Sequence, residues 1–347
     1  MVEAARASHN SPFGMPGITG DYARAVPSDL DLLDLRVIRA LADTGSVTAA
    51  AARLGYSQPA VTQRLRRAEA QLGQPLVLRS TRGVTLTEAG RRLAQHAVHV
   101  QAALDAARQE LDELAGTTTG TLRLAGFPSA SPTLVPALLS TLHDRQPGLT
   151  VSYVEVEPPE GLDLLRSGSI DLALTFSYPG DGRGQAPTST ATTPDVVVET
   201  PLYRDTMLAV APAGSFAGSG AALATLSGAR FIGGCPRCRG HLLAACRRAG
   251  FEPDIVLETD NALAVTGLVA AGLGVAVLPS LSLVSAGLPD GVESRPLDGD
   301  DDRVVHVAHA SGAERVPAVR VAVEALASLD PARFGLRPLR PDVSTRG

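Results

Sequence analysis

Four side chains that could bind a metal ion or react with an oxidant lie within the single stretch CPRCRGHLLAAC: Cys235, Cys238, His241 and Cys246. Thiolates and imidazoles are the usual zinc ligands, and two cysteines separated by two residues can also form a reversible disulfide. A helix that begins near Arg239 would place His241 and Cys246 about 140° apart, so these side chains would face different directions and no metal site is expected. Two interpretations remain. One is a redox switch formed by Cys235 and Cys238 at a helix N-terminus, which lowers a thiol pKa; the other is a tight loop followed by a buried, unreactive Cys246.

The composition bounds the class of protein. The chain has 347 residues, 44% of them hydrophobic and 19% charged, which suits two or three globular domains. No run of about 18 apolar residues predicts a membrane span, and three cysteines without a secretion signal favour a reducing, cytoplasmic compartment. Residues 1–27 and 331–347 are expected to form a disordered leader and a disordered tail.

Motifs of common enzyme classes do not occur in the sequence. It has no Gly-x-Ser-x-Gly elbow, no phosphate-binding loop and no His-Glu metal motif. Gly272 and Gly274 precede an expected strand and lack the order of a dinucleotide-binding loop, which disfavours a hydride-transfer enzyme. We therefore expect a protein that is not an enzyme and that holds no cofactor and no metal. An architectural DNA-binding protein is a further alternative, but it would not need the large acidic body described below.

Positive charge is concentrated near the N-terminus. Every cationic side chain apart from histidine is an arginine. Residues 30–92 hold ten arginines against five carboxylates, a net charge of +5, so the other residues of this chain of net charge −5 sum to −10. A basic module on an acidic body predicts a polyanionic partner for that module alone.

Residues 31–72 show three short helical patterns. The first ends before Gly45, and Ser46 is a natural N-cap for the alanine-rich second helix. Ser57 caps the third helix, and Pro59 suits its first turn. Opposite its apolar stripe, the third helix carries short hydrogen-bonding residues and arginines, which can reach base edges and phosphates in a major groove. We interpret the pattern as a helix-turn-helix, with an ordinary three-helix bundle and a solvated face as the alternative.

A hairpin with a basic tip is predicted in LVLRSTRGVTLT, residues 76–87. A hairpin beside a recognition helix forms a wing, which can contact the DNA backbone or enter the minor groove. We therefore predict a winged helix-turn-helix over residues 28–87. Its candidate DNA contacts are Ser46, Thr48, Ser57, Gln58, Pro59, Thr62, Gln63, Arg64, Arg66, Arg67, Arg79 and Arg82.

A long helix with a heptad pattern is predicted next, because apolar residues from Glu88 to Leu114 alternate at spacings of four and three. Such a seam implies a partner helix, and helix-turn-helix proteins commonly read two half-sites as dimers. We expect residues 88–116 to form a dimerising linker helix, although a solitary amphipathic helix packed on its own domain is the alternative. The predicted seam comprises Leu93, Ala97, Val100, Leu104, Ala107, Leu111 and Leu114.

The block GSVTAAAARLGYSQPAVTQRLRRAEAQLGQPLVLRSTRGVTLTEAG, residues 45–90, resembles the LysR-type transcriptional regulators. With the helix and the body behind it, the resemblance extends over residues 30–328. It implies a bacterial, nucleoid-associated homodimer or homotetramer that binds double-stranded promoter DNA and responds to a small-molecule effector. It also implies that the residues facing DNA include Gln58, Pro59, Thr62, Gln63 and Arg66, with Arg79 and Arg82 in the wing.

The body, residues 117–330, alternates strands with helices, which predicts an α/β fold with parallel sheets. The resemblance implies that this effector domain consists of two α/β lobes similar to periplasmic binding proteins. Lobe I is expected over about 121–200 and 280–330, and lobe II over about 201–279. The predicted fold class is thus α/β with an N-terminal all-α winged helix-turn-helix.

An effector pocket is predicted at the carboxyl ends of the strands, where ligands of such sheets lie beside helix N-termini. Polar caps and helix dipoles there favour an anionic effector such as a carboxylate. For each residue the alternative is a helix cap that binds no ligand. The candidate effector contacts are Ser129, Ala130, Ser131, Thr175, Ser177, Gly234, Cys235, Asp260 and Asn261.

Overall fold

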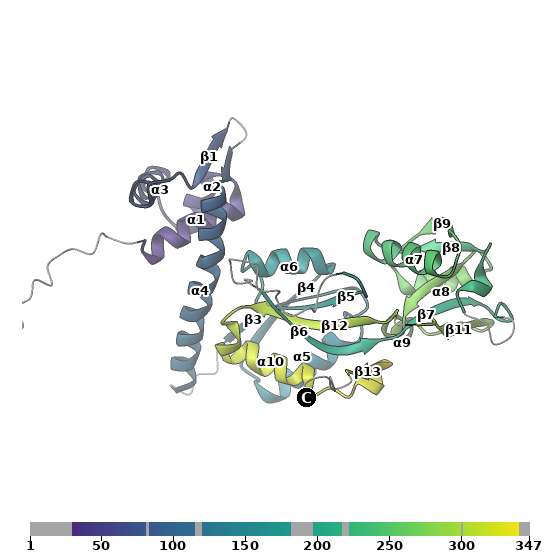
Figure 1. The fold of residues 1–347 in the computed structure, drawn as a ribbon. Helices are drawn as coiled ribbons and strands as arrows, with labels where there is room; N and C mark the ends of the chain where they lie inside the picture. Colours follow the sequence, from purple (N-terminus) through teal and green to yellow (C-terminus); the bar gives the residue numbers. More distant parts are fainter. Residues whose placement is uncertain are drawn as a thin grey trace, which may run out of the picture.

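In the computed structural model the chain forms an N-terminal helical domain, one long helix and two α/β lobes (Figure 1). The structure describes residues 30–80, 83–114, 120–181, 197–216, 222–299 and 301–339, so the leader expected over 1–27 lies outside the described residues. The arrangement confirms the predicted fold class.

Local capping sets the helix ends of the N-terminal domain. The hydroxyls of Ser46 and Ser57 accept hydrogen bonds from backbone N–H groups three residues on, each over 3.4 Å. All three helices end at a glycine whose φ lies between 61° and 72°, a conformation that only glycine adopts freely. The elements are α1 (Leu32–Thr44), α2 (Val47–Leu54), α3 (Gln58–Leu72), β1 (Val77–Ser80) and β2 (Gly83–Leu86).

Two glycines allow the hairpin to approach its neighbours closely. At Gly83, with φ 129°, a Cβ atom would lie 2.7 Å from the Gly45 carbonyl oxygen, which accepts the Val84 N–H over 2.8 Å. At Gly90 a Cβ atom would lie 2.1 Å from the Leu76 carbonyl oxygen. The hairpin is thereby joined to the turn between α1 and α2 and to the first turn of the long helix.

The long helix α4 (Glu88–Leu114) contacts both the N-terminal domain and lobe I. Ala94 belongs to the core of the N-terminal domain, whereas Val98 and Ala106 belong to the core of lobe I. Placing Ala97 in the dimer seam was wrong, because α4 buries this residue against its own chain.

The other predicted seam residues differ in exposure. Leu93 packs partly on the N-terminal core, and Leu104 is half-buried. Val100, Ala107 and Leu111 are exposed along one side of the helix, and the side chain of Leu114 lies outside the described part of the chain. A narrower apolar stripe is therefore available to a partner.

Lobe I is built on a six-stranded sheet in the order β13-β6-β12-β5-β3-β4. Strands β3, β4 and β5 are parallel, and β12 runs antiparallel to both β5 and β6. Helices α5 and α10 pack on one face of the sheet and α6 on the other. The elements are β3 (Gly120–Gly126), α5 (Leu134–Arg145), β4 (Leu149–Glu155), α6 (Pro158–Arg166), β5 (Leu172–Ser177), β6 (Val197–Asp205), β12 (Arg303–Ala310), α10 (Pro317–Ala327) and β13 (Leu336–Pro338).

Lobe II is built on a five-stranded sheet in the order β11-β7-β10-β8-β9. Helix α7 packs on one face, around Leu242 and Cys246, and α8 packs on the other, around Val265 and Val269. The elements are β7 (Met207–Pro212), β8 (Arg230–Gly233), α7 (Pro236–Arg248), β9 (Asp254–Glu258), α8 (Ala262–Ala270), β10 (Val275–Pro279), α9 (Ser280–Ala286) and β11 (Val292–Pro296).

Two predicted boundaries need correction. Strand β6 stays in the sheet of lobe I as far as Asp205, and β11 pairs with β7, so lobe II extends over residues 206–296 instead of 201–279. The disordered tail expected from residue 331 is wrong for residues 331–339. Strand β13 pairs with β6 there, and Phe334 and Leu336 are buried in the core of lobe I, which orders the segment. Residues 340–347 lie outside the described residues.

Candidate DNA-binding surface and interlobe thiol site

One face of α3 carries most of the side chains predicted to contact DNA. The helix buries Val61, Leu65 and Ala68 against the N-terminal core and turns its other side to solvent. There the Gln58 amide donates to the Thr62 hydroxyl over 3.2 Å, so these two groups are held together on one turn. The exposed or half-exposed side chains of this face are Gln58, Pro59, Thr62, Gln63, Arg66 and Arg67.

Arg64 does not belong to this face, and its predicted role as a phosphate contact is wrong. Its Nε donates to Asp34 Oδ1 over 2.8 Å, and its Nη2 pairs with Asp31. The Asp34 side chain is fully buried and has a raised pKa because of that burial. Arg64 lies three residues after the buried Val61, which turns it toward α1 and makes it a link between the two helices.

The remaining predicted DNA contacts lie at or near the starts of α2 and α3 and around the hairpin. Ser46 and Ser57 cap their helices, Thr48 is exposed on α2, and Arg79 is exposed on β1; Arg82 lies outside the described residues. Glu69 has a structural role that the sequence did not reveal. Its Oε1 accepts the backbone N–H groups of Leu76 and Val77 over 2.9 and 3.3 Å, so α3 holds the start of β1 in place.

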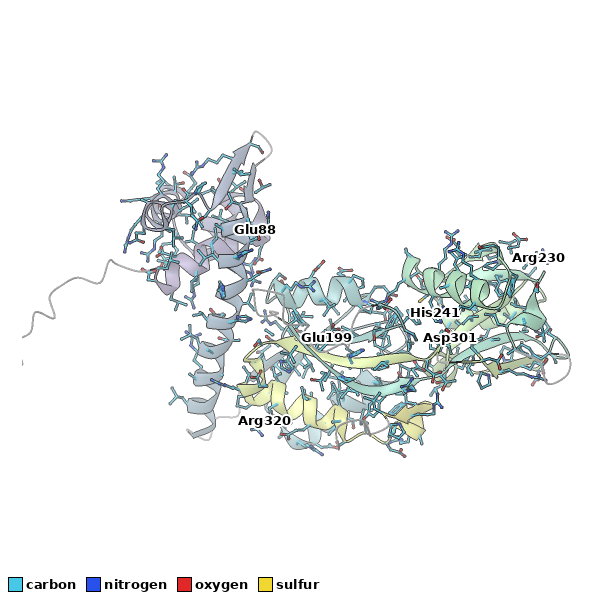
Figure 2. The ribbon with its side chains drawn as sticks, in the orientation of Figure 1. Glu88, Glu199, Arg230, His241, Asp301 and Arg320 are labelled. Carbon is cyan, nitrogen blue, oxygen red and sulfur yellow. The ribbon has the colours of Figure 1, made fainter. Side chains whose placement is uncertain are left out.

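A second candidate site is a cavity of about 70 Å³ between the two lobes. Three predicted effector residues line it: Ser129 follows β3, Gly234 follows β8 and Asp260 follows β9. The three loops lie at carboxyl ends of parallel strands, as expected for ligand sites in such sheets. His241, labelled in Figure 2, lies on α7 where the two lobes meet.

The other predicted effector residues do not line this cavity, because their polar groups bind within the protein. The Thr175 hydroxyl donates to Glu199, labelled in Figure 2, over 2.8 Å. Asn261 caps α8 by accepting the Ala264 N–H. Ser131 bonds to Tyr153 over 2.5 Å, Ser177 bonds to His306 over 2.8 Å, and Ala130 is buried in the turn after β3. Cys235 lies behind the lining, beside Cys238.

Arg303 is a cavity residue that the sequence analysis missed. It is only 2% exposed, and its Nε donates to the buried Asp205 over 2.8 Å. Its Nη2 donates to the Ser129 hydroxyl over 2.6 Å, and its guanidinium carbon lies 4.5 Å from the centre of the Phe176 ring. An arginine at the start of the apolar strand segment RVVHVAHA was the available signal, because a buried charge needs a specific partner.

The cavity brings a pair of thiols to the N-terminus of α7. The helix begins at Pro236, three residues earlier than expected, and Cys235 is its N-cap. The Cys235 thiol donates to the Cys238 sulfur over 3.2 Å, and the Tyr178 hydroxyl donates to the same sulfur over 3.6 Å. These donors stabilise a thiolate at Cys238 in preference to Cys235.

The surroundings of the two thiols separate their pKa values. The hydrogen bond from Cys235, with further help from Tyr178 and the positive charge of Arg303, lowers the pKa of Cys238 to about 7 against the opposing effect of burial. The pKa of Cys235 is raised, because its proton is held in the hydrogen bond to Cys238 and because the site is buried. Of the two thiols, Cys238 is therefore the one that ionises first, while Cys235 keeps its proton.

Two further titratable groups line the cavity. Burial lowers the pKa of His241 to about 4, so its imidazole is neutral; the ring stacks on Tyr178 with centroids 4.0 Å apart. Burial, followed by the negative charges possible on Cys235 and Asp260, raises the pKa of Glu157 to about 7. Glu157 and Tyr178 were not predicted from the sequence, because nothing local marks either residue as a neighbour of the thiols.

The lobes touch each other around this site. Tyr178 follows β5 of lobe I, whereas His241 and Cys238, its partners in the stack and the hydrogen bond, belong to α7 of lobe II. Arg237 of α7 also pairs with Asp181 of lobe I. The two lobes are therefore in direct contact around the thiol pair.

Among the described residues, no group of three or more His, Cys, Asp or Glu side chains is placed to hold a metal ion. Cys246 is fully buried in the core of lobe II, where burial raises its pKa to about 12. A search of the same residues for a helix long and apolar enough to cross a membrane finds none.

Two family models match the chain. The model of the LysR substrate binding domain matches residues 115–330, and that of the bacterial regulatory helix-turn-helix protein of the lysR family matches residues 32–91. A probable hydrogen peroxide-inducible genes activator of Streptomyces viridosporus is 34% identical over 258 residues, which cover 72% of this chain and 77% of that protein.

Solved structures show the same architecture. A full-length cysteine-to-aspartate variant of OxyR from Pseudomonas aeruginosa aligns with a TM-score of 0.66 at 23% identity, covering 90% of this chain and 99% of the other. A hydrogen-peroxide-bound cysteine-to-serine variant of Corynebacterium glutamicum OxyR aligns with a TM-score of 0.51 at 26% identity, covering 86% and 91%. The chain belongs to the LysR family of transcriptional regulators, with a helix-turn-helix DNA-binding domain and a two-lobed effector-binding domain.

Proposed function

We propose that this LysR-family regulator senses a peroxide-class oxidant at Cys238 and that the oxidation state of Cys238 controls its binding to promoter DNA in the bacterial cytoplasm. The observation that carries the proposal is the Cys238 sulfur, which lines the interlobe cavity and accepts hydrogen bonds from Cys235 and Tyr178. A thiolate held by two donors near a buried arginine is the reactive form of cysteine.

The size of the cavity supports a very small effector. Its volume of about 70 Å³ is well below the roughly 300–1,000 Å³ of typical ligand pockets. Hydrogen peroxide has only two heavy atoms and fits such a space. The names of the relatives in Streptomyces viridosporus and Mycobacterium avium, both probable hydrogen peroxide-inducible genes activators, support the same class of signal.

The chemistry balances with the two cysteines alone. The Cys238 thiolate attacks one peroxide oxygen and the O–O bond breaks. The second oxygen leaves as water after taking up a proton equivalent to the one that Cys238 lost on ionising, so that Cys238 becomes a sulfenic acid. The Cys235 sulfur then attacks Cys238, a disulfide forms, and the hydroxyl leaves with the Cys235 proton as a second water. The two thiols are oxidised and one peroxide is reduced.

An anionic effector, predicted from the helix caps, is the second candidate, and Arg303 is the observation in its favour. However, Arg303 already pairs with Asp205, and Glu157 and Asp260 add carboxylates to the same lining. A neutral peroxide does not oppose these charges, and for that reason we prefer it.

The proposal is tested by mobility shift of the full-length protein on the DNA upstream of its own gene, before and after hydrogen peroxide. We expect peroxide to change the affinity of the wild type and to leave Cys238→Ser unchanged. The matched control is Cys246→Ala, which removes a buried thiol of high pKa and should respond like the wild type. If peroxide leaves the wild type unchanged while a carboxylate such as benzoate changes its affinity, the anionic effector replaces the oxidant.

We further propose that the exposed face of α3 enters the major groove. Gln58, Thr62, Gln63 and Arg66 would contact base edges there, and Arg67 and Arg79 would contact phosphates. Pro59 lies on the same face, and we propose Ser46, Thr48 and Ser57 as further contacts. Arg82 is assigned to the wing from the hairpin pattern in the sequence and from the resemblance. Pairing through the exposed stripe of α4 would present two such faces to a two-fold operator, in a homodimer or a tetramer built from it. No catalytic turnover is proposed for the chain.

A further inference from the structure

We infer that Glu157 donates the proton that the leaving oxygen of peroxide needs when Cys238 is oxidised. The inference rests on the proposed function and assigns a new role to a residue of the same cavity. It follows from the position of the Glu157 carboxyl, from one carboxyl oxygen that has no hydrogen-bond partner among the described residues, and from the needs of the reaction.

Glu157 is placed in the cavity by its position in lobe I. It follows β4 and immediately precedes α6, and its side chain lines the same cavity as Cys238 of lobe II. Closure of the lobes therefore brings the carboxyl and the thiol to the same small space.

The Glu157 carboxyl still has capacity for a hydrogen bond. The Glu157 side chain hydrogen-bonds to Cys235, but its Oε2 atom is buried and has no hydrogen-bond partner among the described residues. The Nε2 atom of His241, which lines the same cavity, also has none. Buried polar atoms are normally satisfied, so these two unsatisfied atoms on the lining of one cavity are available to hydrogen-bond a small polar molecule inside it.

The reaction requires an acid at this place. Attack by a thiolate on peroxide expels an oxygen that would leave as hydroxide, a poor leaving group in a buried site unless it is protonated. Protonated Glu157 supplies that proton: the S–O bond forms, the O–O bond breaks, and the products are a Cys238 sulfenic acid, water and a Glu157 carboxylate. Charge and atoms balance without a further reactant.

The other polar groups that face the Glu157 carboxyl do not fit this role. The Tyr178 hydroxyl donates to Cys238, and burial raises its pKa well above the ordinary value, so it keeps its proton. His241 is neutral at physiological pH because burial lowers its pKa to about 4. Arg303 is committed to Asp205 and Ser129, Cys235 donates to Cys238, and Asp260 contributes negative charge that favours a protonated Glu157.

The two reacting groups, the Cys238 thiol and the Glu157 carboxyl, titrate over the same range of pH. The Cys238 thiolate increases as the pH rises through about 7, whereas protonated Glu157 decreases as the pH rises through about 7. Their product is greatest near neutrality, so we expect the rate of sulfenic acid formation to follow a bell-shaped pH profile.

The test compares two reagents on the full-length protein, with modification of Cys238 followed by mass spectrometry. Hydrogen peroxide needs a proton on its leaving oxygen, whereas iodoacetamide expels iodide and needs none. We expect Glu157→Gln to slow the reaction with peroxide by about 100-fold at pH 7 and to remove the falling limb of the profile. Alkylation by iodoacetamide should be unchanged or faster, because loss of the negative charge lowers the pKa of Cys238.

Controls separate this role from structural effects. Glu160→Gln, an exposed change on the same helix, should react like the wild type with both reagents. Glu157→Asp keeps a carboxyl and should recover part of the peroxide rate, which also covers the case in which Glu157→Gln fails to fold. Equal slowing of both reagents, or unchanged peroxide kinetics in Glu157→Gln, would overturn the inference but leave a reactive Cys238. If wild-type Cys238 itself does not react with peroxide, the proposed function fails as well.

Discussion

At the scale of single residues, Arg64 and Arg66 show how two arginines of one helix acquire different roles. Arg64 faces α1 and pairs with Asp31 and with the buried Asp34. Arg66 is exposed on the face that carries Gln63. The difference follows from their angular positions on α3, because Arg64 lies one turn from the buried Val61.

Replacing each arginine with alanine should therefore have opposite consequences. We expect Arg66→Ala to weaken binding to the upstream DNA by about 1–3 kcal/mol with little change in stability. Arg64→Ala should lower the free energy of unfolding by about 1–3 kcal/mol, because it leaves the Asp34 carboxylate buried without its partner, while the folded protein keeps its DNA affinity.

Mobility shifts at several salt concentrations, combined with thermal unfolding, distinguish the two effects. The slope of the logarithm of the binding constant against the logarithm of the salt concentration reports phosphate contacts. If the magnitude of this slope decreases by about 1 for Arg64→Ala but not for Arg66→Ala, Arg64 and not Arg66 contacts DNA. Equal affinity of the wild type for upstream and random DNA would argue against specific recognition altogether.

The sequence identified reactive residues only where they lie close together along the chain. Cys235 and Cys238 stand out by their spacing, and their separation at a helix N-terminus suggested redox chemistry. Arg303, Glu157 and Tyr178 come from three other segments and reach the thiols only through the closure of two lobes. Predicting them requires the tertiary fold. Conversely, Thr175 and Ser177 end a strand as predicted, but their hydroxyls bond to residues of other strands in the same sheet.

At the scale of elements, the junction between the hairpin and α4 depends on the absence of a side chain at Gly90. The Leu76 carbonyl oxygen lies where a Cβ atom of residue 90 would be, at 2.1 Å, and it accepts the Thr87 N–H over 3.0 Å. Because the obstructing atom belongs to the backbone, relief would require α4 or the start of the hairpin to move.

We expect Gly90→Ala to lower the stability of the N-terminal domain by about 1–3 kcal/mol, as overpacking does. The matched control is Gly267→Ala on α8, where nothing lies within 4 Å of the added methyl group. That change should stabilise its helix by about 0.5–1 kcal/mol, because alanine is the better helix former. Chemical denaturation followed by amide hydrogen exchange in residues 32–94 and 262–270 measures the stability change in the N-terminal domain and in α8. A Gly90→Ala variant as stable as the wild type would contradict the close contact at Gly90.

The helices of the N-terminal domain were predictable because their ends are local. Asp31, Ser46 and Ser57 cap their own helices, and glycines end them, so the sequence contains the necessary information. Strands β6, β11 and β13 could not be predicted from the sequence, because each pairs with a strand far away along the chain. β13 is held in place because Phe334 and Leu336 are buried in the core of lobe I and because the strand pairs with β6, about 130 residues earlier in the chain. No local sequence pattern indicates either contact.

At the scale of the whole molecule, α4 links the DNA-reading domain to the sensor and leaves one side uncovered. The helix buries Ala94, Val98 and Ala106 within its own chain, but Val100 and Leu111 remain exposed. Apolar residues repeated along an exposed helix side are typical of a helix-pairing surface.

Leu111→Glu should convert an oligomer to a monomer and weaken operator binding, because a single domain reads one half-site. Leu263→Glu on α8 is the control, since Leu263 is 65% exposed and Leu111 64% exposed. Light scattering of the two variants checks the expectation. An unchanged mass for Leu111→Glu would place the contact between copies elsewhere.

The two passages of the chain between the lobes, at Thr206 and at residues 297–299 and 301–302, lie side by side. The Leu297 N–H donates to the Met207 carbonyl oxygen, and the Met207 N–H donates to the Asp302 carboxylate. We expect any rotation of one lobe relative to the other to occur about these two connections. Arg303, Tyr178 and Glu157 belong to lobe I, whereas Cys238 belongs to lobe II. Rotation of lobe II away from lobe I would separate the Cys238 sulfur from the Arg303 guanidinium, the Tyr178 hydroxyl and the Glu157 carboxyl in a single movement. We therefore expect Cys238 to react with peroxide only while the two lobes are in contact, and to be unreactive when they are apart.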